Sequence, residues 1–173
     1  VAVQGDHAFV ASYDMGMSVI DITNPASPQH VGSVDTPKAA RGVAVSGTYA
    51  YIADDSLLQV ADVSNPALPV LIESGLALSD AIDIVIQGQY AFVARGSSGL
   101  AVIDISTPSS LQLVADLDAI GDVGGVTVDG DYAYTVQYSL GNAVHVIDIS
   151  DPGNPVVTGT VDLYTGGEGI AKW

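Results

Sequence analysis

The chain has 173 residues, of which 48% are hydrophobic and 14% charged, with 19 Gly, 8 Pro and no Cys. Hydrophobicity this high excludes an intrinsically disordered chain, and the absence of cysteine excludes a disulfide scaffold. Glu and Lys occur only twice each, too rarely for a coiled coil or a long helical protein. A globular, β-rich chain with one sizeable core remains.

The charge is strongly acidic, with 4 Lys and Arg against 20 Asp and Glu and a net charge of −16. Nucleic acid and anionic membrane surfaces are disfavoured as partners, because both are bound through clustered cations. No apolar run approaches the ~18 residues that a membrane helix needs, so we expect no membrane insertion. The sequence begins at Val1 rather than Met, so the lack of a signal peptide predicts nothing about the compartment.

A pattern of four short strands recurs four times along the chain. The strands are expected at residues 1–3, 8–11, 19–22 and 30–34, then at 43–45, 50–53, 60–63 and 70–72, then at 84–86, 91–94, 102–105 and 113–117, and finally at 126–128, 133–136, 146–149 and 156–161. These repeats occupy residues 1–42, 43–83, 84–125 and 126–169, and residues 170–173 begin a fifth. We treat the whole chain as one domain.

Turn residues separate the strands at fixed places. A glycine between the first two strands of each repeat permits the positive φ of a tight hairpin, and these are Gly5, Gly47, Gly88 and Gly130. A proline follows each third strand and stops it, because proline has no N–H for the ladder. No helical periodicity is present.

The first strands are apolar on both faces, as in Val1-Ala2-Val3 and Ile84-Val85-Ile86. A sheet that is apolar on both faces must be covered on both faces. In an antiparallel repeat protein the neighbouring sheet provides that cover. The pattern therefore predicts an all-β fold, a β-propeller of four-stranded antiparallel blades of about 42 residues. A β-sandwich is the alternative, but it does not require a repeat of this length.

Several segments resemble the LVIVD-repeat family across essentially the whole chain. They are residues 47–53, residues 99–108, and residues 24–28 followed by Val31-Gly32. The resemblance implies a β-propeller of a secreted or surface-anchored microbial protein, without a shared set of catalytic residues. The chain departs from the pattern at Leu111, where the other repeats have proline, and in a longer loop at residues 137–143.

Residues 169–171 repeat the pattern of residues 42–44. We therefore expect four blades of a larger ring, or half of a ring that a second copy completes; a closed four-bladed ring is the alternative. An open arc of blades would expose apolar faces and favour self-association.

One aspartate ends the third strand of every repeat: Asp21, Asp62, Asp104 and Asp148. A ring of carboxylates is one interpretation. A residue that serves every blade is better explained as a turn residue, whose carboxylate accepts a local backbone hydrogen bond.

Function is more plausible where the repeats differ. In a propeller, the loops after the second strand and before the first lie on one face, around the mouth of the channel. We expect a ligand-binding or partner-binding face there, formed by Tyr13, Asp14, Arg41, Asp54, Asp55, Asp83, Arg95, Gln137, Tyr138 and Glu168.

Metal and catalytic motifs are weak. His7, His30 and His145 occupy non-equivalent positions, so no shared metal site is expected. Asp54-Asp55 and Asp129-Gly130-Asp131 are weak Ca²⁺ candidates, because neither has the spacing of a Ca²⁺ loop. No nucleophile motif is present, so no catalytic residue and no cofactor is predicted.

Three functional hypotheses follow. The first is a non-catalytic, secreted or cell-surface (or periplasmic) module that binds a protein or glycan through the exposed tyrosines Tyr13, Tyr138 and Tyr164. The second is a hydrolase or lyase with a divalent metal at the channel mouth, held by Asp54, Asp55 and Glu168. The third is a structural segment whose blade edges drive assembly.

Overall fold

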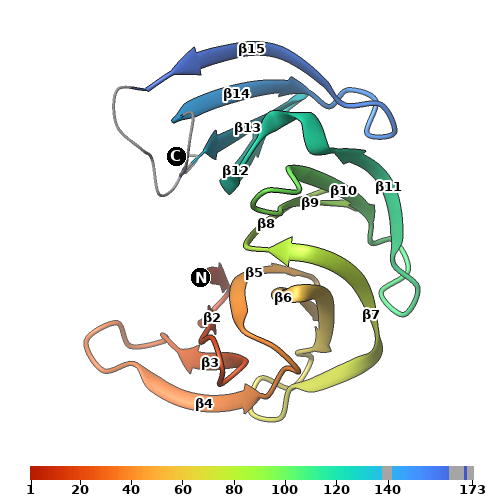
Figure 1. Ribbon diagram of the computed structural model, residues 1–173. Coiled ribbons are helices and arrows are strands. Elements are labelled where there is room, and N and C mark those ends of the chain that lie inside the picture. The colour runs from red at the N-terminus through yellow and green to blue at the C-terminus, as the bar shows by residue number, and fades with distance from the viewer. Residues whose placement is uncertain (138–141, 164–169, 171–173) are drawn as a thin grey trace. The chain divides into compact units, whose positions relative to one another are not determined.

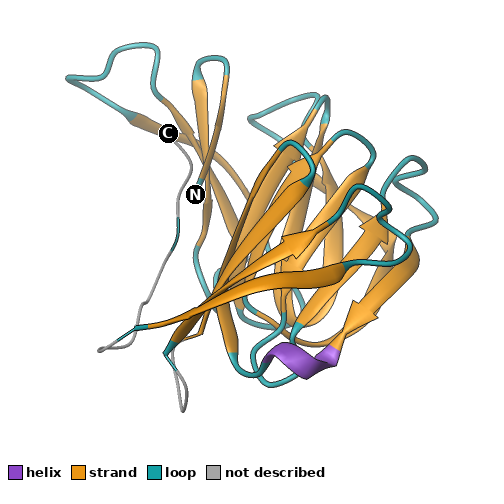
Figure 2. Cartoon of the chain, turned by 90° about the horizontal axis from the view of Figure 1, so that it is seen from above, coloured by secondary structure: helices purple, strands orange, loops and turns teal. Residues whose placement is uncertain are grey.

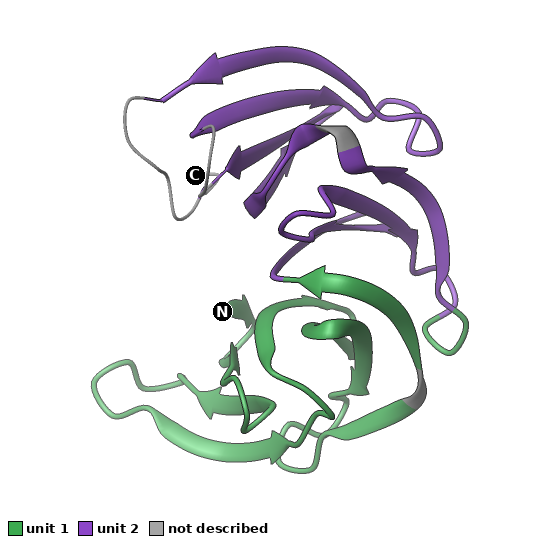
Figure 3. Cartoon of the chain, in the orientation of Figure 1, with its two compact units in different colours: residues 1–81, 108–110 green, residues 82–107, 111–173 purple. Residues whose placement is uncertain are grey.

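The computed structural model describes residues 1–137, 142–163 and 170, with the backbone alone for residues 73, 74 and 119. The chain divides into two compact units, residues 1–81 with 108–110 and residues 82–107 with 111–173 (Figure 3). Each unit contains two antiparallel sheets.

The first unit holds a four-stranded sheet and a three-stranded sheet, with strand orders β1-β2-β3-β4 and β5-β6-β7 (Figure 1). The strands are β1 (Ala2–Gln4), β2 (His7–Ala11), β3 (Met17–Asp21), β4 (Gln29–Val34), β5 (Ala40–Ser46), β6 (Tyr49–Asp62) and β7 (Val70–Ala81). All pairings are antiparallel, as the short glycine turns predict.

The second unit holds two four-stranded sheets, in the orders β8-β9-β10-β11 and β12-β13-β14-β15. The strands are β8 (Asp83–Gln87), β9 (Tyr90–Ala94), β10 (Leu100–Asp104), β11 (Gln112–Leu117), β12 (Val123–Asp129), β13 (Tyr132–Gln137), β14 (Ala143–Asp148) and β15 (Val156–Asp162). Among the described residues the helical structure is confined to a 3₁₀ turn, η1 (Asp118–Ile120), drawn in purple in Figure 2. No helix in this part of the chain is long and apolar enough to span a membrane.

The second repeat departs from the prediction of four separate strands. Its second and third strands run on as β6, whose residues 49–54 pair with β5 and whose residues 55–62 pair with β7. Asp55, at φ 55°, lies where the pairing changes partner. The residues between the expected strands are therefore part of the ladder rather than a loop.

A β-bulge recurs between the third and fourth strands of three sheets. The register shifts by one residue after Val19, Val102 and Val146. The β6–β7 pair has larger irregularities instead, between Asp55 and Leu57 and between Leu58 and Val60. A bulge interrupts the alternation of side chains, which explains why the fourth strands show no clean pattern in the sequence.

Each unit buries an apolar core between its two sheets. In the first unit Phe9, Met17 and Val19 of one sheet pack with Ile52 and Ala61 of the other. The second unit has the same arrangement. Phe92, Ala94, Leu100 and Val102 of one sheet pack with buried residues of the other sheet, which are Val126, Val128, Ala133 and Ile147. The facing sides of the two sheets in each unit are thus covered, as expected, whereas Val1 and Val3 of the first predicted strand are 79% and 64% exposed, so cover on both faces is absent there.

The recurring aspartates are turn residues, as predicted. The carboxylates of Asp21, Asp62, Asp104 and Asp148 each accept a hydrogen bond of 2.8 or 2.9 Å from the backbone N–H two residues on. Hydrogen bonds from the side chain and then the backbone of that Ser or Thr lower the pKa of each carboxyl. These side chains fix the turn before each fourth strand.

Candidate functional site

The residue that follows each second strand varies from repeat to repeat: Ser12, Asp54, Arg95 and Gln137. Asp54, Arg95 and Gln137 are buried although all three are polar. A buried polar group is stable only when it is hydrogen-bonded, so its partners define its role.

Asp54 fastens the connection between β4 and β5. Its Oδ1 accepts a 2.8 Å hydrogen bond from Thr36 Oγ1, and its Oδ2 accepts one of 3.1 Å from the Lys38 backbone N–H. Burial raises the pKa of Asp54, and these two hydrogen bonds act in the opposite direction. Both carboxylate oxygens are therefore committed to the chain itself.

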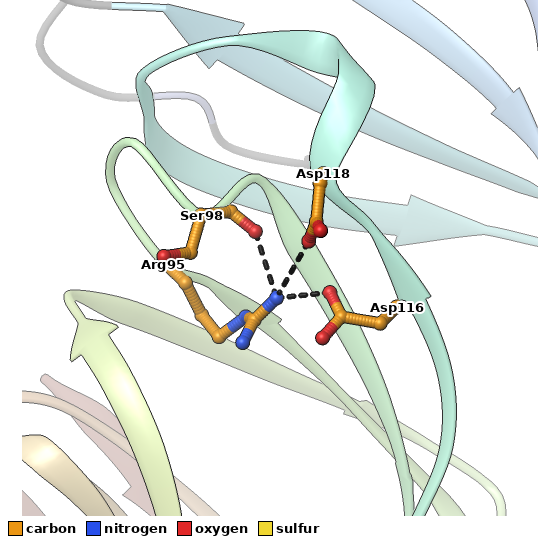
Figure 4. Close-up of polar contacts among 4 residues, drawn as sticks. All are labelled: Arg95, Ser98, Asp116 and Asp118. Atoms are coloured by element: carbon orange, nitrogen blue, oxygen red, sulfur yellow. Dashed lines mark hydrogen bonds and ion pairs between the residues drawn. The ribbon is translucent and has the colours of Figure 1, made fainter.

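Arg95 forms the centre of a charged cluster in the second unit (Figure 4). Its Nη2 donates to the Ser98 carbonyl at 2.7 Å, to the Asp116 carboxylate, and to Asp118 Oδ1 at 3.4 Å. The Arg95 side chain is 6% exposed, whereas Asp118 is 78% exposed. The guanidinium thus joins its own turn to β11 and to the start of η1.

Burial and then the neighbouring Asp118 raise the pKa of Asp116, while Arg95 acts against the rise. The buried Nε of Arg95 has no partner among the described residues. The cluster contains one cation and two carboxylates. It is therefore an ion-pair cluster within the chain, with one negative charge in excess when both carboxylates are ionised.

Gln137 fastens the segment before β12. Its Nε2 donates a 2.5 Å hydrogen bond to the Ile120 carbonyl. Gly121, at φ 76°, lies so close that a Cβ there would stand 2.2 Å from Gln137 Nε2. The Gln137 amide therefore occupies the space that a side chain at position 121 would need.

The remaining predicted face residues of the first unit are exposed. Tyr13 is 61% exposed, and Asp14 beside it is also exposed. Arg41 and Asp55 form an ion pair of 3.2 Å with both side chains about 40% exposed, a geometry that contributes little to stability.

Asp83 stands at a position where other repeats have Gly42 and Gly125. Its Oδ2 accepts a 3.0 Å hydrogen bond from the Val126 N–H of the next sheet, and burial raises its pKa. Tyr138, Tyr164 and Glu168 lie outside the described residues.

Backbone pairing brings part of the predicted face together within each unit. Tyr13 forms an antiparallel bridge to Ala40, which is in register with Asp54. Gly96 forms the same bridge to Val123, which is in register with Gln137. Tyr13 and Asp54 thus lie along one row of paired residues in the first unit, and Gly96 and Gln137 lie along the corresponding row in the second.

Metal-binding residues do not gather in the part of the chain that the structure describes. No group of three or more His, Asp or Glu side chains is placed there to hold an ion. His145 Nδ1 lies 3.0 Å from Thr160 Oγ1, and its Nε2 is buried without a partner among the described residues.

Four residues were missed in the prediction from sequence. Thr36, Asp116 and Asp118 hold the buried polar residues, but they lie in connections and outer strands with no repeated pattern. Gln59 was missed as well, although it is the one polar residue within Leu57-Leu58-Gln59-Val60-Ala61.

The chain matches the family model described as LVIVD repeat four times, at residues 1–36, 37–76, 79–119 and 120–163. The comparison with curated proteins finds no match.

Solved structures with a similar fold include the periplasmic gluconolactonase PpgL of Pseudomonas aeruginosa, with a TM-score of 0.79 and 14% identity over 94% of this chain and 56% of that one. A functionally unknown protein from Desulfotomaculum acetoxidans gives a TM-score of 0.74 and 15% identity over 92% and 56%. The computationally designed Ika8 protein gives 0.71 and 14% over 95% and 48%. The chain thus spans about half the length of these structures. At this identity the likeness concerns the fold, and it confirms the predicted all-β propeller class.

Proposed function

Since the chain belongs to the LVIVD-repeat family of β-propellers, we propose that it is a non-catalytic module of a secreted or cell-surface protein that binds a protein partner through the turn at residues 12–16. The observation that supports this most is the exposure of two large side chains on that turn. Tyr13 is 61% and Met15 70% exposed, with Asp14 between them.

The turn is held rigidly by its own backbone. Ser12 N–H donates to the Gly16 carbonyl at 2.7 Å, and Gly16 N–H donates to the Tyr13 carbonyl at 2.9 Å. Tyr13 and Ala40 exchange two further hydrogen bonds, of 2.9 and 3.1 Å. A rigid turn loses little conformational entropy when a partner binds.

The backbone of Tyr13 is strained, because φ is 51° in a bulky residue that disfavours positive φ. Such strain is kept where surrounding structure enforces it, and it is frequent at binding sites. Gly16, at φ 66°, lies so close to β4 that a Cβ would stand 2.3 Å from the Val34 carbonyl oxygen. The backbone of the turn that carries Tyr13 and Met15 is therefore held by several hydrogen bonds and by its close packing against β4.

The chemistry of these side chains favours a protein over a glycan. Tyr and Met are enriched in the cores of protein interfaces, where a thioether adapts to an irregular apolar surface. The equivalent turn of the third repeat is Gly96-Ser97-Ser98-Gly99, which presents no large side chain. The exposed Tyr13 and Met15 of the first repeat therefore have no counterpart in the third repeat, so the fold of a blade does not need large side chains at this turn.

The buried charges support a structural role for the rest of the face. Asp54, Arg95 and Gln137 are each bonded to their own connections, so none is a free catalytic group. The alternative hydrolase or lyase needs a divalent metal on Asp54, Asp55 and Glu168. Elemental analysis of the dialysed protein separates the hypotheses, since a stoichiometric divalent metal would favour the enzyme.

The binding proposal is tested by capture from the culture supernatant and envelope fraction of the source cells, followed by affinity measurement with the captured protein. Tyr13→Ala and Met15→Ala should each weaken binding at least tenfold, the size of a binding hot spot. Tyr132→Ala, at a residue 42% exposed in another repeat, is the matched control. All three variants should keep the melting temperature of the wild type. Equal binding by wild type and Tyr13→Ala would reject the turn as the contact.

A further inference from the structure

A cavity of about 420 Å³ lies in the first unit. It is lined by Pro37, Leu57, Gln59, Leu71, Ile72 and Gly75. A volume of this size is within the ~300–1,000 Å³ range of small-molecule sites. Among the residues whose side chains the structure describes, the lining is apolar apart from the carboxamide of Gln59.

That carboxamide belongs to Gln59, which is 6% exposed. Gln59 lies on β6 between Leu58 and Val60, where the pairing with β7 is irregular. Among the residues that the structure describes, no group hydrogen-bonds to the Gln59 amide. The Gln59 amide atoms are not among the fully buried atoms without a partner, so its two donors and its acceptor remain accessible from the cavity.

Gly75 makes room for this amide. A Cβ on Gly75 would lie 2.8 Å from Gln59 Oε1 and 3.1 Å from Nε2, so a side chain at position 75 would displace the Gln59 amide. Gly75 and the Gln59 amide are therefore neighbours in the cavity wall, and both Oε1 and Nε2 of Gln59 lie beside Gly75.

We propose that this cavity binds a small, uncharged and mainly apolar molecule that carries a cis-amide edge, as a lactam does. An ionised ligand is disfavoured because none of the described lining side chains would compensate its charge. A lactam presents an N–H and a C=O side by side, so it pairs with both Oε1 and Nε2 of Gln59 at once. Its ring methylenes contact Leu57, Leu71 and Ile72, which provide the apolar burial.

The experiment titrates δ-valerolactam into the ¹⁵N-labelled chain and follows the ¹H–¹⁵N spectrum. The side-chain NH₂ signals of Gln59, assigned by their loss in Gln59→Leu, should shift and saturate together with the backbone signals of Leu57 and Gly75. N-methyl-δ-valerolactam lacks the donor and should bind about fivefold more weakly, the effect of one lost hydrogen bond.

Gln59→Leu should weaken δ-valerolactam binding about tenfold or more, because both hydrogen bonds are lost. Gly75→Ala displaces the amide by a different route and should weaken binding too, so a folding defect in either variant leaves the test intact. Gln29→Leu is the control, because the Gln29 amide is exposed and bonds only to Ser27 and Pro28. Unmoved Gln59 signals would show that water alone occupies the cavity. That result, or equal binding by Gln59→Leu and the wild type, would overturn the proposal.

Discussion

The side-chain amide of Gln4 donates a 2.7 Å hydrogen bond to the carbonyl oxygen of Gly47, the turn glycine of the next repeat. Gln87 makes the same 2.7 Å bond to Gly130 in the second unit. In both units, therefore, a side chain on the first strand of one sheet is hydrogen-bonded to the first hairpin of the neighbouring sheet. This contact adds a directional link to the apolar packing between the sheets.

The Gln87 link should contribute measurably to stability. Gln87→Ala should lower the free energy of unfolding by about 1 kcal/mol, the usual net value of one hydrogen bond. Urea titration measures the loss. Gln29→Ala is the comparison, because its amide bonds only within its own turn. An equal loss of free energy in both variants would show that this hydrogen bond between sheets stabilises the fold no more than hydrogen bonds within a turn do.

Gly121 should tolerate no side chain. Its φ of 76° and ψ of −156° lie in a region that only glycine populates readily, so Gly121→Ala should cost about 1–3 kcal/mol in chemical unfolding. Gln137→Ala in the same chain removes the atom that the new Cβ would meet and should recover part of that cost. Gly130→Ala, with open space around its Cβ position, isolates the backbone contribution. If Gly121→Ala lowers the free energy of unfolding no more than Gly130→Ala does, the contact with Gln137 does not contribute to the cost.

The turn aspartates should stabilise the fold only when they are ionised. Their pKa values are lowered from 3.8, so the stability they add is present above that value and is lost as pH falls through the lower folded pKa. Asp104→Asn should therefore lower the melting temperature at pH 7, and the difference from wild type should vanish below the folded pKa. Asp131→Asn makes the same charge change at an exposed turn. A pH-independent difference for Asp104→Asn would contradict the linkage.

Asp83 should behave in the opposite way. Its pKa is raised by burial, so ionisation opposes folding above that raised pKa and stability recovers as pH falls through it. Asp83→Asn keeps an oxygen for the Val126 N–H and should raise the melting temperature at pH 7. The gain should shrink in acid, where wild-type Asp83 is protonated. A loss of stability at pH 7 would mean that the ionised carboxylate is needed for the Val126 contact.

The strands and their order could be predicted because their signals are local. Gly88 must end a tight hairpin and Pro108 must end a strand wherever the chain folds. The continuity of β6 could not be predicted in this way. It depends on Asp55 adopting a positive φ, which the sequence Asp54-Asp55 permits but does not require.

The candidate face was predicted as a set of positions, but its buried contacts were not. Apart from the Ser98 carbonyl, the groups that bond to Asp54, Arg95 and Gln137 lie 16 to 23 residues away, in connections and an outer strand whose course depends on the packed sheets. Sequence alone distinguishes a polar residue from an apolar one. It does not show whether that residue faces solvent or holds a neighbouring segment in place.

The recurring bulge in the outermost strands has a consequence for behaviour at high concentration. β4, β11 and β15 are edge strands, and β15 exposes Val156, Val157 and Val161. A long, flat edge with such side chains would pair readily with another chain and start a fibril. One extra residue in each strand twists that edge out of plane, so the backbone cannot continue as an uninterrupted ladder into a second molecule.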